Sequence, residues 1–399
     1  MKPVKKLDRL PTLNAARELK MARSAHAYVR GNTVKFYEWL AESPVARMLP
    51  VGPPIWICGD CHLGNLGPVS DGDGAVKIQI RDLDQTVVGN PAHDLIRLGL
   101  SLATAARGSD LPGVTTAHMV EQMIEGYIHA LVEPEDDDAA PEPDVVRSVK
   151  RRAMGRRWRH LARERIDGTS PSIPLGKKFW PIEARERTAL TDLFADPEMQ
   201  RQILSLNPKD EDRAVELVDA AYWMKGCSSL GLLRYAALLR INGAKGRADY
   251  ALVDLKEAIR PAAPASKRAR MPKDPAMRVV AGARALSPYL GNRMIAARLL
   301  GKSVFIRELA PQDLKLEVEQ FSQDQAVKAA RYLAYIVGTA HARQMEKERR
   351  AAWRKTLLDY SSLNIDAPSW LWDSIVDLSS THEAGYLQHC RQFALSKAA

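Results

Sequence analysis

The strand-like segments of this chain fall into two blocks, with helical sequence before, between and after them. The first block holds the short apolar run PPIWICGD and the alternating run AVKIQIRDLD, with the turn-rich connector GPVSDGDGA between them. The second block extends from about residue 222 to residue 310. Strands that are segregated from helices in this way favour an α+β fold. The sequence therefore predicts helical, mixed, helical, strand-rich and helical parts, in that order.

Composition bounds the size and the compartment. A chain of 399 residues with 46% hydrophobic and 27% charged residues can bury a sizeable core in two or three units. The N-terminus is basic without an apolar run after it, and no long apolar stretch follows, so we expect neither export nor a membrane span. Four cysteines are too few for a disulfide framework, and a cytoplasmic location fits best. The net charge of +10 is compatible with an anionic partner but does not choose one.

Residues 56–67, WICGDCHLGNLG, allow several interpretations. Cys58 and Cys61 have the spacing of a dithiol, and with His62 that of a haem attachment site. Haem attachment follows export, which we do not expect for this chain. A catalytic dithiol needs a helix directly after it, and the glycines and proline of this region disfavour one. Zinc needs a second ligand pair, which is not found at a suitable spacing. The remaining interpretation takes Asp60 and Asn65 as part of a phosphoryl-transfer loop.

Downstream carboxylates favour that interpretation. Phosphoryl transfer calls for a carboxylate facing the acceptor hydroxyl, an amide oxygen on magnesium and a further carboxylate on the metal. Asp60 and Asn65 supply the first two, and Asp82, at the end of the strand VKIQIRD, supplies the third. Asp84 follows two residues later, and two such carboxylates repel each other without a cation, which favours Mg²⁺.

The segment GDCHLGNLG…IQIRDLDQTVVGNPAHDLIRLGLSLA resembles the Brenner-type motif and metal-binding segment of aminoglycoside phosphotransferases and choline kinases. The resemblance covers about 45 residues. It implies that Asp60 is the catalytic aspartate and that Asn65 and Asp82 bind the metal. It also implies that Asp94 braces the catalytic loop through hydrogen bonds or a helix cap.

The whole chain resembles a bacterial family catalogued as domain of unknown function 2252, on the strength of SAHAYVRGN, CGDCHLGNLG, IRDLDQT and GCSSLG. That resemblance implies a bilobal protein-kinase-like fold, with a helix-rich C-lobe and a small antiparallel-sheet nucleotide lobe.

The nucleotide lobe is expected after the catalytic loop, because only 59 residues precede Asp60 and they have helical character. Gly226 and Gly231, with Ser228 and Ser229 between them, lie between two predicted strands, as a loop that folds over phosphates would. Lys256 lies in the next predicted strand, where its ammonium could reach the phosphates of ATP.

The remaining segments complete a circularly permuted order. A predicted helix at 275–286, the strand SVFIREL and a helix ending near His341 follow, and that last helix should pack beside the strand that starts at Ile55. One nucleotide and its metal must bridge Lys256 and Asp82, so the two should lie within about 10 Å of each other.

Three details remain open in the sequence. The helix at 275–286 has no glutamate to pair with Lys256, so Glu257, an acid from a distant loop, or no acid at all serves the lysine. His62 is interpreted as a residue that orients the loop by a hydrogen bond. Arg30 is placed for an interior ion pair or a phosphate contact, between which the sequence does not choose.

We therefore expect a catalytic lobe at 1–221, with a linker and basic insert at 133–182, a nucleotide lobe at 222–310 and C-terminal helices at 311–399 that pack back on the catalytic lobe. The expected function is an ATP- and Mg²⁺-dependent transfer to a hydroxyl of a small molecule, with nucleotidyl transfer left open. The alternative is a catalytically silent kinase-like module that binds RNA or a protein through the Arg-rich segment 147–165, which an unpaired Lys256 would favour. The acceptor and the oligomeric state stay open.

Overall fold

A computed structural model of the protein describes residues 6–71, 74–134, 141–156, 172–205, 213–227, 229–242, 248–267, 269–314, 322–359 and 366–398. These residues form a mixed structure of helices and antiparallel sheets. None of the helices in this part of the chain combines the length and the apolar character that crossing a bilayer requires.

The largest sheet has six strands in the order β5-β6-β7-β8-β10-β9. They are β5 (Phe179–Trp180), β6 (Ala214–Trp223), β7 (Arg234–Asn242), β8 (Ala248–Glu257), β9 (Met294–Leu299) and β10 (Lys302–Glu308). Alternate side chains of β7 enter two separate cores: Tyr235, Ala237 and Leu239 lie in one, and Ala236 and Leu238 in the other. Burial on both faces explains why β7 is apolar along most of its length.

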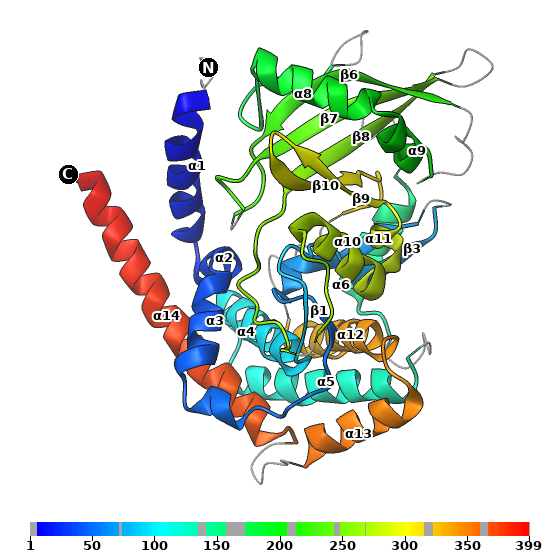
Figure 1. The fold of residues 1–399 in the computed structure, drawn as a ribbon. Helices are drawn as coiled ribbons and strands as arrows, with labels where there is room; N and C mark the ends of the chain where they lie inside the picture. The colour runs from blue at the N-terminus through cyan, green and yellow to red at the C-terminus, as the bar shows by residue number, and fades with distance from the viewer. Residues whose placement is uncertain are drawn as a thin grey trace.

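Helices cover this sheet on two sides. α8 (Ala184–Ala195) and α9 (Pro197–Ser205) lie over it at the top of Figure 1 and pack against β6. α10 (Pro275–Leu286) packs on β9 and β10 and also contacts β1, so it lies between the sheet and the helical part of the molecule. Asp274 starts α10 by accepting hydrogen bonds from the amides of Ala276 and Met277.

The first helix, α1 (Lys6–Met21), ties the sheet to the rest of the chain. Arg9 of α1 forms a buried ion pair with Glu186 of α8 at 2.8 Å, and its guanidinium lies over the ring of Tyr222. The same helix contacts α2 and α14 on its other side.

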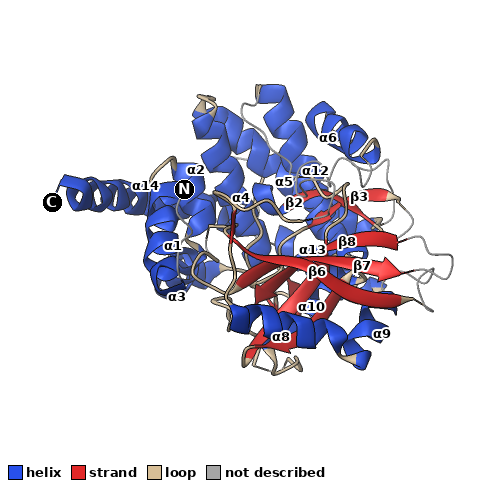
Figure 2. Ribbon diagram, turned by 90° about the horizontal axis from the view of Figure 1, so that it is seen from above, coloured by secondary structure: helices blue, strands red, loops and turns tan. Residues whose placement is uncertain are grey.

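Most of the helical part lies below the sheet in Figure 1, and in Figure 2, seen from above, many of its helices appear beside the red strands. Its closest pair is α5 and α12, which approach at Gly126 and Gly338: a Cβ on Gly126 would lie 2.2 Å from the carbonyl oxygen of Arg331. The helices are α2 (Ala25–Gly31), α3 (Thr33–Glu42), α4 (Ala92–Gly108), α5 (Gly113–Val132), α6 (Asp144–Met154), α11 (Pro288–Gly291), α12 (Gln323–Ala342), α13 (Lys347–Leu358) and α14 (Ser369–Ala398), with 3₁₀ turns η1 (Val45–Met48) and η2 (Leu63–Asn65).

Two small sheets lie between these parts. β1 (Ile55–Ile57) pairs with β4 (Val87–Gly89), and β2 (Leu66–Ser70) pairs with β3 (Val76–Ile80). Gln344, just after α12, accepts a hydrogen bond from the amide of Trp56 at 2.8 Å and donates one to its carbonyl at 3.0 Å. The end of α12 thus packs beside β1, as the sequence predicts.

The structure corrects two expectations. Residues 67–70 were expected in a turn-rich connector, but they form most of β2, and Pro68 is tolerated because a two-stranded sheet leaves its missing N–H at an edge. The strand-rich unit was expected to begin at 222, whereas β5, α8, α9 and most of β6 precede that residue. The charged Glu216 and Asp219 interrupt the apolar pattern of β6, and Glu216 is paired with Arg240 on β7.

Candidate active site

The loop that follows β1 is held by Asp94 at the start of α4. One carboxylate oxygen of Asp94 accepts from the amide of Cys58 at 2.7 Å, and the other from the amide of Gly59 at 2.9 Å. His341 of α12 lies 3.2 Å from the same carboxylate. Gly59 has φ +75°, and a Cβ there would lie 2.3 Å from the carbonyl oxygen of Gln85. The bracing contact expected of Asp94 is therefore present as hydrogen bonds to the loop backbone.

Asp60, the next residue, is buried and bonded to Arg97 of α4. Arg97 Nε donates to Asp60 Oδ1 at 2.9 Å, and Arg97 Nη2 donates to the carbonyl of Val29 at 2.6 Å. Burial raises the pKa of Asp60, and the Arg97 guanidinium opposes that rise. The ion pair engages one carboxylate oxygen, and Oδ2 lies 3.9 Å from His62 Nε2.

His62 and Asn65 flank the same carboxylate. Burial, followed by the nearby Arg30 and Arg97 guanidinium groups, keeps the pKa of His62 well below its usual value, so its ring is neutral. Asn65 donates its side-chain amide hydrogen to the Asp60 carbonyl at 3.0 Å. That bond leaves the amide oxygen of Asn65 as an acceptor or ligand.

Lys256 on β8 meets the two carboxylates that follow β3. Lys256 Nζ lies 3.5 Å from Asp82 Oδ1 and also forms an ion pair with Asp84 Oδ2. The predicted proximity of Lys256 and Asp82 is confirmed. Burial and repulsion by Asp82 raise the pKa of Asp84 to about 6. Burial acts in the same direction on Asp82, but the charge of Lys256, a hydrogen bond with Asp84 and the charges of two arginines together outweigh it and lower the pKa of Asp82.

The acid that serves Lys256 therefore comes from the segment after β3. Glu257 is bound elsewhere, to Lys302 at 2.7 Å and to the amide of Leu233 at 2.9 Å. In place of a glutamate, α10 offers Arg278, which donates to the carbonyl oxygens of Thr86 and Asp84 and so holds the Asp84 backbone.

The predicted glycine loop lies between β6 and β7. Gly226 and Gly231 both have positive φ, at +103° and +104°, a conformation that favours glycine. Lys20 of α1 donates to the Gly226 carbonyl at 2.8 Å, and Ser229 is buried beneath it. Gly231 lies against Leu10 and Asn14 of α1, away from the carboxylates, and Ser228 lies outside the described residues.

A cavity of about 930 Å³ joins these groups. Asp60, His62, Asn65, Asp82 and Asp84 line it from one side, and Gly226, Ser229 and Lys256 line it from the sheet side. Val279, Leu290, Met294 and Phe305 give part of the wall an apolar surface. Nine of the predicted site residues thus share one cavity, counting Arg30.

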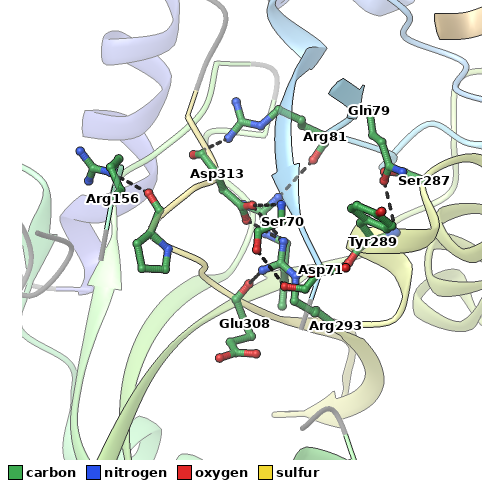
Figure 3. A network of polar contacts seen from close by, with 12 residues as sticks. Ser70, Asp71, Gln79, Arg81, Arg156, Ser287, Tyr289, Arg293, Glu308 and Asp313 are labelled. Atoms are coloured by element: carbon green, nitrogen blue, oxygen red, sulfur yellow. Dashed lines mark hydrogen bonds and ion pairs between the residues drawn. The ribbon is translucent and has the colours of Figure 1, made fainter. Parts of the chain in front are cut away.

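The segment after β10 forms another wall of this cavity, and Figure 3 shows how it is held. Arg293 bonds both carboxylate oxygens of Asp313, at 2.9 and 3.0 Å, while Arg81 donates to the Asp313 carbonyl at 3.0 Å. Arg156, beyond the end of α6, donates to the carbonyl of Pro311 at 2.6 Å. The wall is therefore fixed to the helical part through β3 and the region after α6.

Comparison with known families gives a match over nearly the whole chain. A family model described as "Uncharacterized protein conserved in bacteria (DUF2252)" matches residues 9–392. The chain belongs to this family. Neither the curated proteins nor the solved structures contain a significant match to the DUF2252 chain.

Sequence reasoning about the DUF2252 chain missed Arg97, the buried partner of Asp60. The sequence contains one signal of it: Arg97 is a charged residue in the apolar stretch DLIRLGLSLA, and it is fully buried in the structure. A buried arginine calls for a carboxylate partner, and Asp60 is that partner.

The Arg-rich segment expected at 147–165 is described only as far as residue 156. Arg147 pairs with Asp144 on the surface, and Arg152 and Arg156 line the cavity. RNA binding through this segment stays a prediction, since residues 157–165 lie outside the described part of the DUF2252 chain.

Proposed function

We propose that the protein is an ATP- and Mg²⁺-dependent phosphotransferase that acts on a hydroxyl group of a small molecule. The observation that carries the proposal is the meeting of Lys256 with Asp82 at 3.5 Å, in the cavity that also holds Asp60 and Asn65. A lysine for the phosphates, carboxylate and amide oxygens for the metal and a carboxylate for the acceptor are the groups that phosphoryl transfer requires.

We further propose a protein-kinase-like fold in circularly permuted order. The order of elements supports it: a hairpin with a glycine loop (β6 and β7), a lysine strand (β8), a helix (α10), two strands (β9 and β10) and then α12. The hydrogen bonds of Gln344 to Trp56 support the join, because they attach the end of α12 to the strand that leads into Asp60.

The residues present fit a magnesium ion that arrives with a nucleotide. Asp84 Oδ1 is buried and has no hydrogen-bond partner among the described residues, and the neighbouring Asp82 carboxylate lies beside it, with Lys256 3.5 Å away. No group of three or more His, Cys, Asp or Glu side chains in the described chain forms a complete metal site. Magnesium commonly takes one or two carboxylates and completes its shell with water and substrate phosphates. Asn65, Asp82 and Asp84 would hold it, and it would neutralise phosphate charge.

The protein's own residues then divide the remaining work. Asp60 Oδ2 accepts a hydrogen bond from the acceptor hydroxyl and receives its proton as the hydroxyl oxygen bonds to the γ-phosphorus of ATP. The bond from that phosphorus to the bridging oxygen breaks, and ADP leaves with the electron pair. Arg97 fixes the direction of the Asp60 carboxylate through Oδ1. Lys256 exchanges part of its ion pairing with Asp82 and Asp84 for the phosphates of the nucleotide. The amides of the glycine loop offer further donors to those phosphates.

The alternative of a catalytically silent module is less well supported. The feature that favoured it was an unpaired Lys256, and Lys256 is instead paired with Asp82 and Asp84.

A labelling experiment tests the proposal. The purified protein is incubated with Mg²⁺, a pool of hydroxyl-bearing metabolites and ATP labelled at either the γ- or the α-phosphate. Transfer of the γ-label supports phosphotransfer, and transfer of the α-label alone would replace it by nucleotidyl transfer. A protein that fails to bind magnesium–ATP in a calorimetric titration would overturn both.

Asp60→Asn separates chemistry from binding. A positioned base contributes about 10²–10⁴-fold in rate, so turnover should fall at least about a hundredfold. Nucleotide affinity should stay within about threefold of the unmodified protein's, because Asp60 contacts the acceptor side. Unchanged turnover in this variant would remove Asp60 from the assigned role.

A further inference from the structure

The cavity carries a surplus of positive charge. Its described lining includes eleven lysine and arginine side chains but only five aspartates. Every one of those aspartates already has a cationic partner: Arg97 for Asp60, Lys256 for Asp82 and Asp84, Arg234 for Asp254 and Arg293 for Asp313. The lysine and arginine side chains of the described lining therefore outnumber its carboxylates, and some of them donate to backbone carbonyl oxygens instead.

Part of this surplus comes from the first two helices. Lys20 of α1, Arg23 just after it and Arg30 of α2 line the cavity, with Arg30 beside the Asp60 loop and Lys20 bonded to the Gly226 carbonyl. The guanidinium groups of Arg23 and Arg30 make no hydrogen bond or ion pair with any other residue in the described part of the chain. Like charges gathered without partners cost free energy, and a bound anion would relieve that cost.

Arg30 is held directly beside the catalytic loop. A Cβ on Gly64 would lie 2.7 Å from Arg30 Cζ, so the guanidinium packs where a side chain at position 64 would otherwise sit. Gly64 lies between Asp60 and Asn65, and its lack of a side chain is what admits Arg30. The guanidinium also lies close enough to His62 and His26 to lower the pKa of each, an effect second to that of their burial.

The second carboxylate oxygen of Asp60 lies near His62, a residue that also has Arg30 nearby. Asp60 Oδ1 is engaged by Arg97, whereas Oδ2 lies 3.9 Å from His62 Nε2, and His62 lines the cavity with Arg30. His62 is neutral, so the positive charge near this oxygen comes from the arginines. A hydroxyl bonded to Oδ2 therefore places the rest of its molecule within reach of Arg30.

We propose that Arg30, with Arg23 and Lys20, forms an oxyanion subsite for the acceptor, and that the acceptor is a small hydroxyl compound that also carries a phosphate or carboxylate group. The assignment of the bound anion to the acceptor rests on the proposed function, whereas the anion site itself does not. An arginine fork suits both oxyanions, so the two are separated by experiment.

A binding experiment tests the subsite apart from catalysis. The full-length protein is first saturated with a non-hydrolysable ATP analogue and Mg²⁺, which fills the nucleotide side. Inorganic phosphate is then titrated calorimetrically, and acetate in a parallel titration at equal ionic strength. We expect one of them to bind, and the double variant Arg23→Gln/Arg30→Gln to weaken that binding at least about tenfold. Binding that survives unchanged in the double variant, or no binding of either anion, overturns the proposal.

Two further variants test whether Arg30 itself is responsible for anion binding. Arg47→Gln removes an exposed arginine outside the cavity lining and should leave anion binding unchanged. Gly64→Ala should weaken it about as much as Arg30→Gln, because the added methyl group displaces the far end of a flexible side chain and not the backbone. Full anion affinity in Gly64→Ala would contradict the placement of Arg30.

Failure of the anion subsite can be distinguished from failure of the phosphotransferase proposal. If the protein does not bind the nucleotide analogue, the phosphotransferase proposal fails, and the same titrations on the nucleotide-free protein still decide the anion site. If nucleotide binds and the anions do not, the subsite fails alone. With an active enzyme, transfer should be confined to phosphorylated or carboxylated alcohols, and Arg30→Gln should raise KM for the acceptor more than it lowers kcat.

Discussion

Arg97 and Asp60 form a buried ion pair in which Arg97 is fixed in position and Asp60 has one carboxylate oxygen not engaged by Arg97. Arg97 is fully buried and also bonded to the carbonyl of Val29, so its position is fixed by the helix α4 on which it lies. Asp60 keeps one oxygen toward the cavity. The ion pair thus fixes the orientation of a carboxylate that lies on a glycine-containing loop.

Removing Arg97 alone should be costly. Arg97→Met leaves the Asp60 carboxylate buried without its cation, and breaking a buried pair in this way typically lowers the free energy of unfolding by about 3–5 kcal/mol. The double variant Arg97→Met/Asp60→Asn should recover part of that loss, because its side chain at position 60 is neutral. Urea unfolding of the single and double variants measures the difference. Additive losses would show that the two residues do not stabilise each other.

His382 of α14 should make the protein sensitive to acid. Burial, followed by the charges of Arg97 and Lys35, lowers its pKa to about 3, whereas an unfolded histidine titrates near 6.5. Below about pH 6.5 the unfolded chain therefore binds a proton that the folded chain does not, and the free energy of unfolding falls as the pH drops toward about 3.

The matching variant is His382→Leu. It should flatten the acid side of the stability curve by up to about 1.4 kcal/mol per pH unit, measured by urea unfolding between pH 7 and pH 5. His26 and His93 have pKa values of about 4 and remain in the variant, so a residual slope is expected. Parallel curves for the two proteins would contradict the assignment to His382.

Among the elements, α5 and α12 depend on close contact between their backbones. Gly126→Ala should lower the free energy of unfolding by about 1–3 kcal/mol, because its Cβ would lie 2.2 Å from a carbonyl oxygen of α12 that cannot move freely. Gly113→Ala, in the same helix, is the control: its Cβ meets nothing within 4 Å, and it should be neutral or slightly stabilising. Equal effects of the two variants in thermal unfolding would show that the helix contact is not responsible.

Sequence patterns within single elements predicted many of the helices and strands. The Gly-rich hairpin, the lysine strand, the helix at 275–286 and the long helix before His341 are all present. β2 was missed because Gly67 and Pro68 are typical of turns, and only its pairing with β3 makes them part of a strand. The partner of Lys256 stayed open among three alternatives for a similar reason: a sequence pattern places residues along one chain segment but does not show that Lys256 of β8 meets both carboxylates after β3.

At the scale of the molecule, the cavity joins groups that are far apart in the chain, from residue 20 to residue 314. Lys20, Asp60, Lys256 and Asp313 line the same space. The total charge of +10 is visible in the sequence, but its concentration in one cavity depends on the fold. The proposed anionic acceptor could therefore not be inferred before the structure.

Nucleotide binding should stabilise the whole molecule. A ligand at about 100 times its Kd adds about 2.7 kcal/mol to the free energy of unfolding if it binds only the folded state. A magnesium–ATP analogue should therefore raise Tm. The sheet and the helical part should unfold in one transition, because α10 packs on both and Arg9 of α1 bonds to α8 and covers Tyr222 of β6. Lys256→Met should lose most of the shift, and a shift that persists in full would remove Lys256 from nucleotide binding. Differential scanning calorimetry records both quantities.

The bond from Gln344 to Trp56 and the contact of Gly126 with α12 have a consequence during synthesis. The ribosome completes β1, the Asp60 loop and α5 long before it adds α12, so α5 has α4 beside it but lacks its most extensive partner for about half of translation. We expect the emerging N-terminal half to need protection from aggregation, by a chaperone or by the ribosome surface, until residue 344 has left the exit tunnel. Ribosome-bound chains stalled before and after that point should differ sharply in protease resistance.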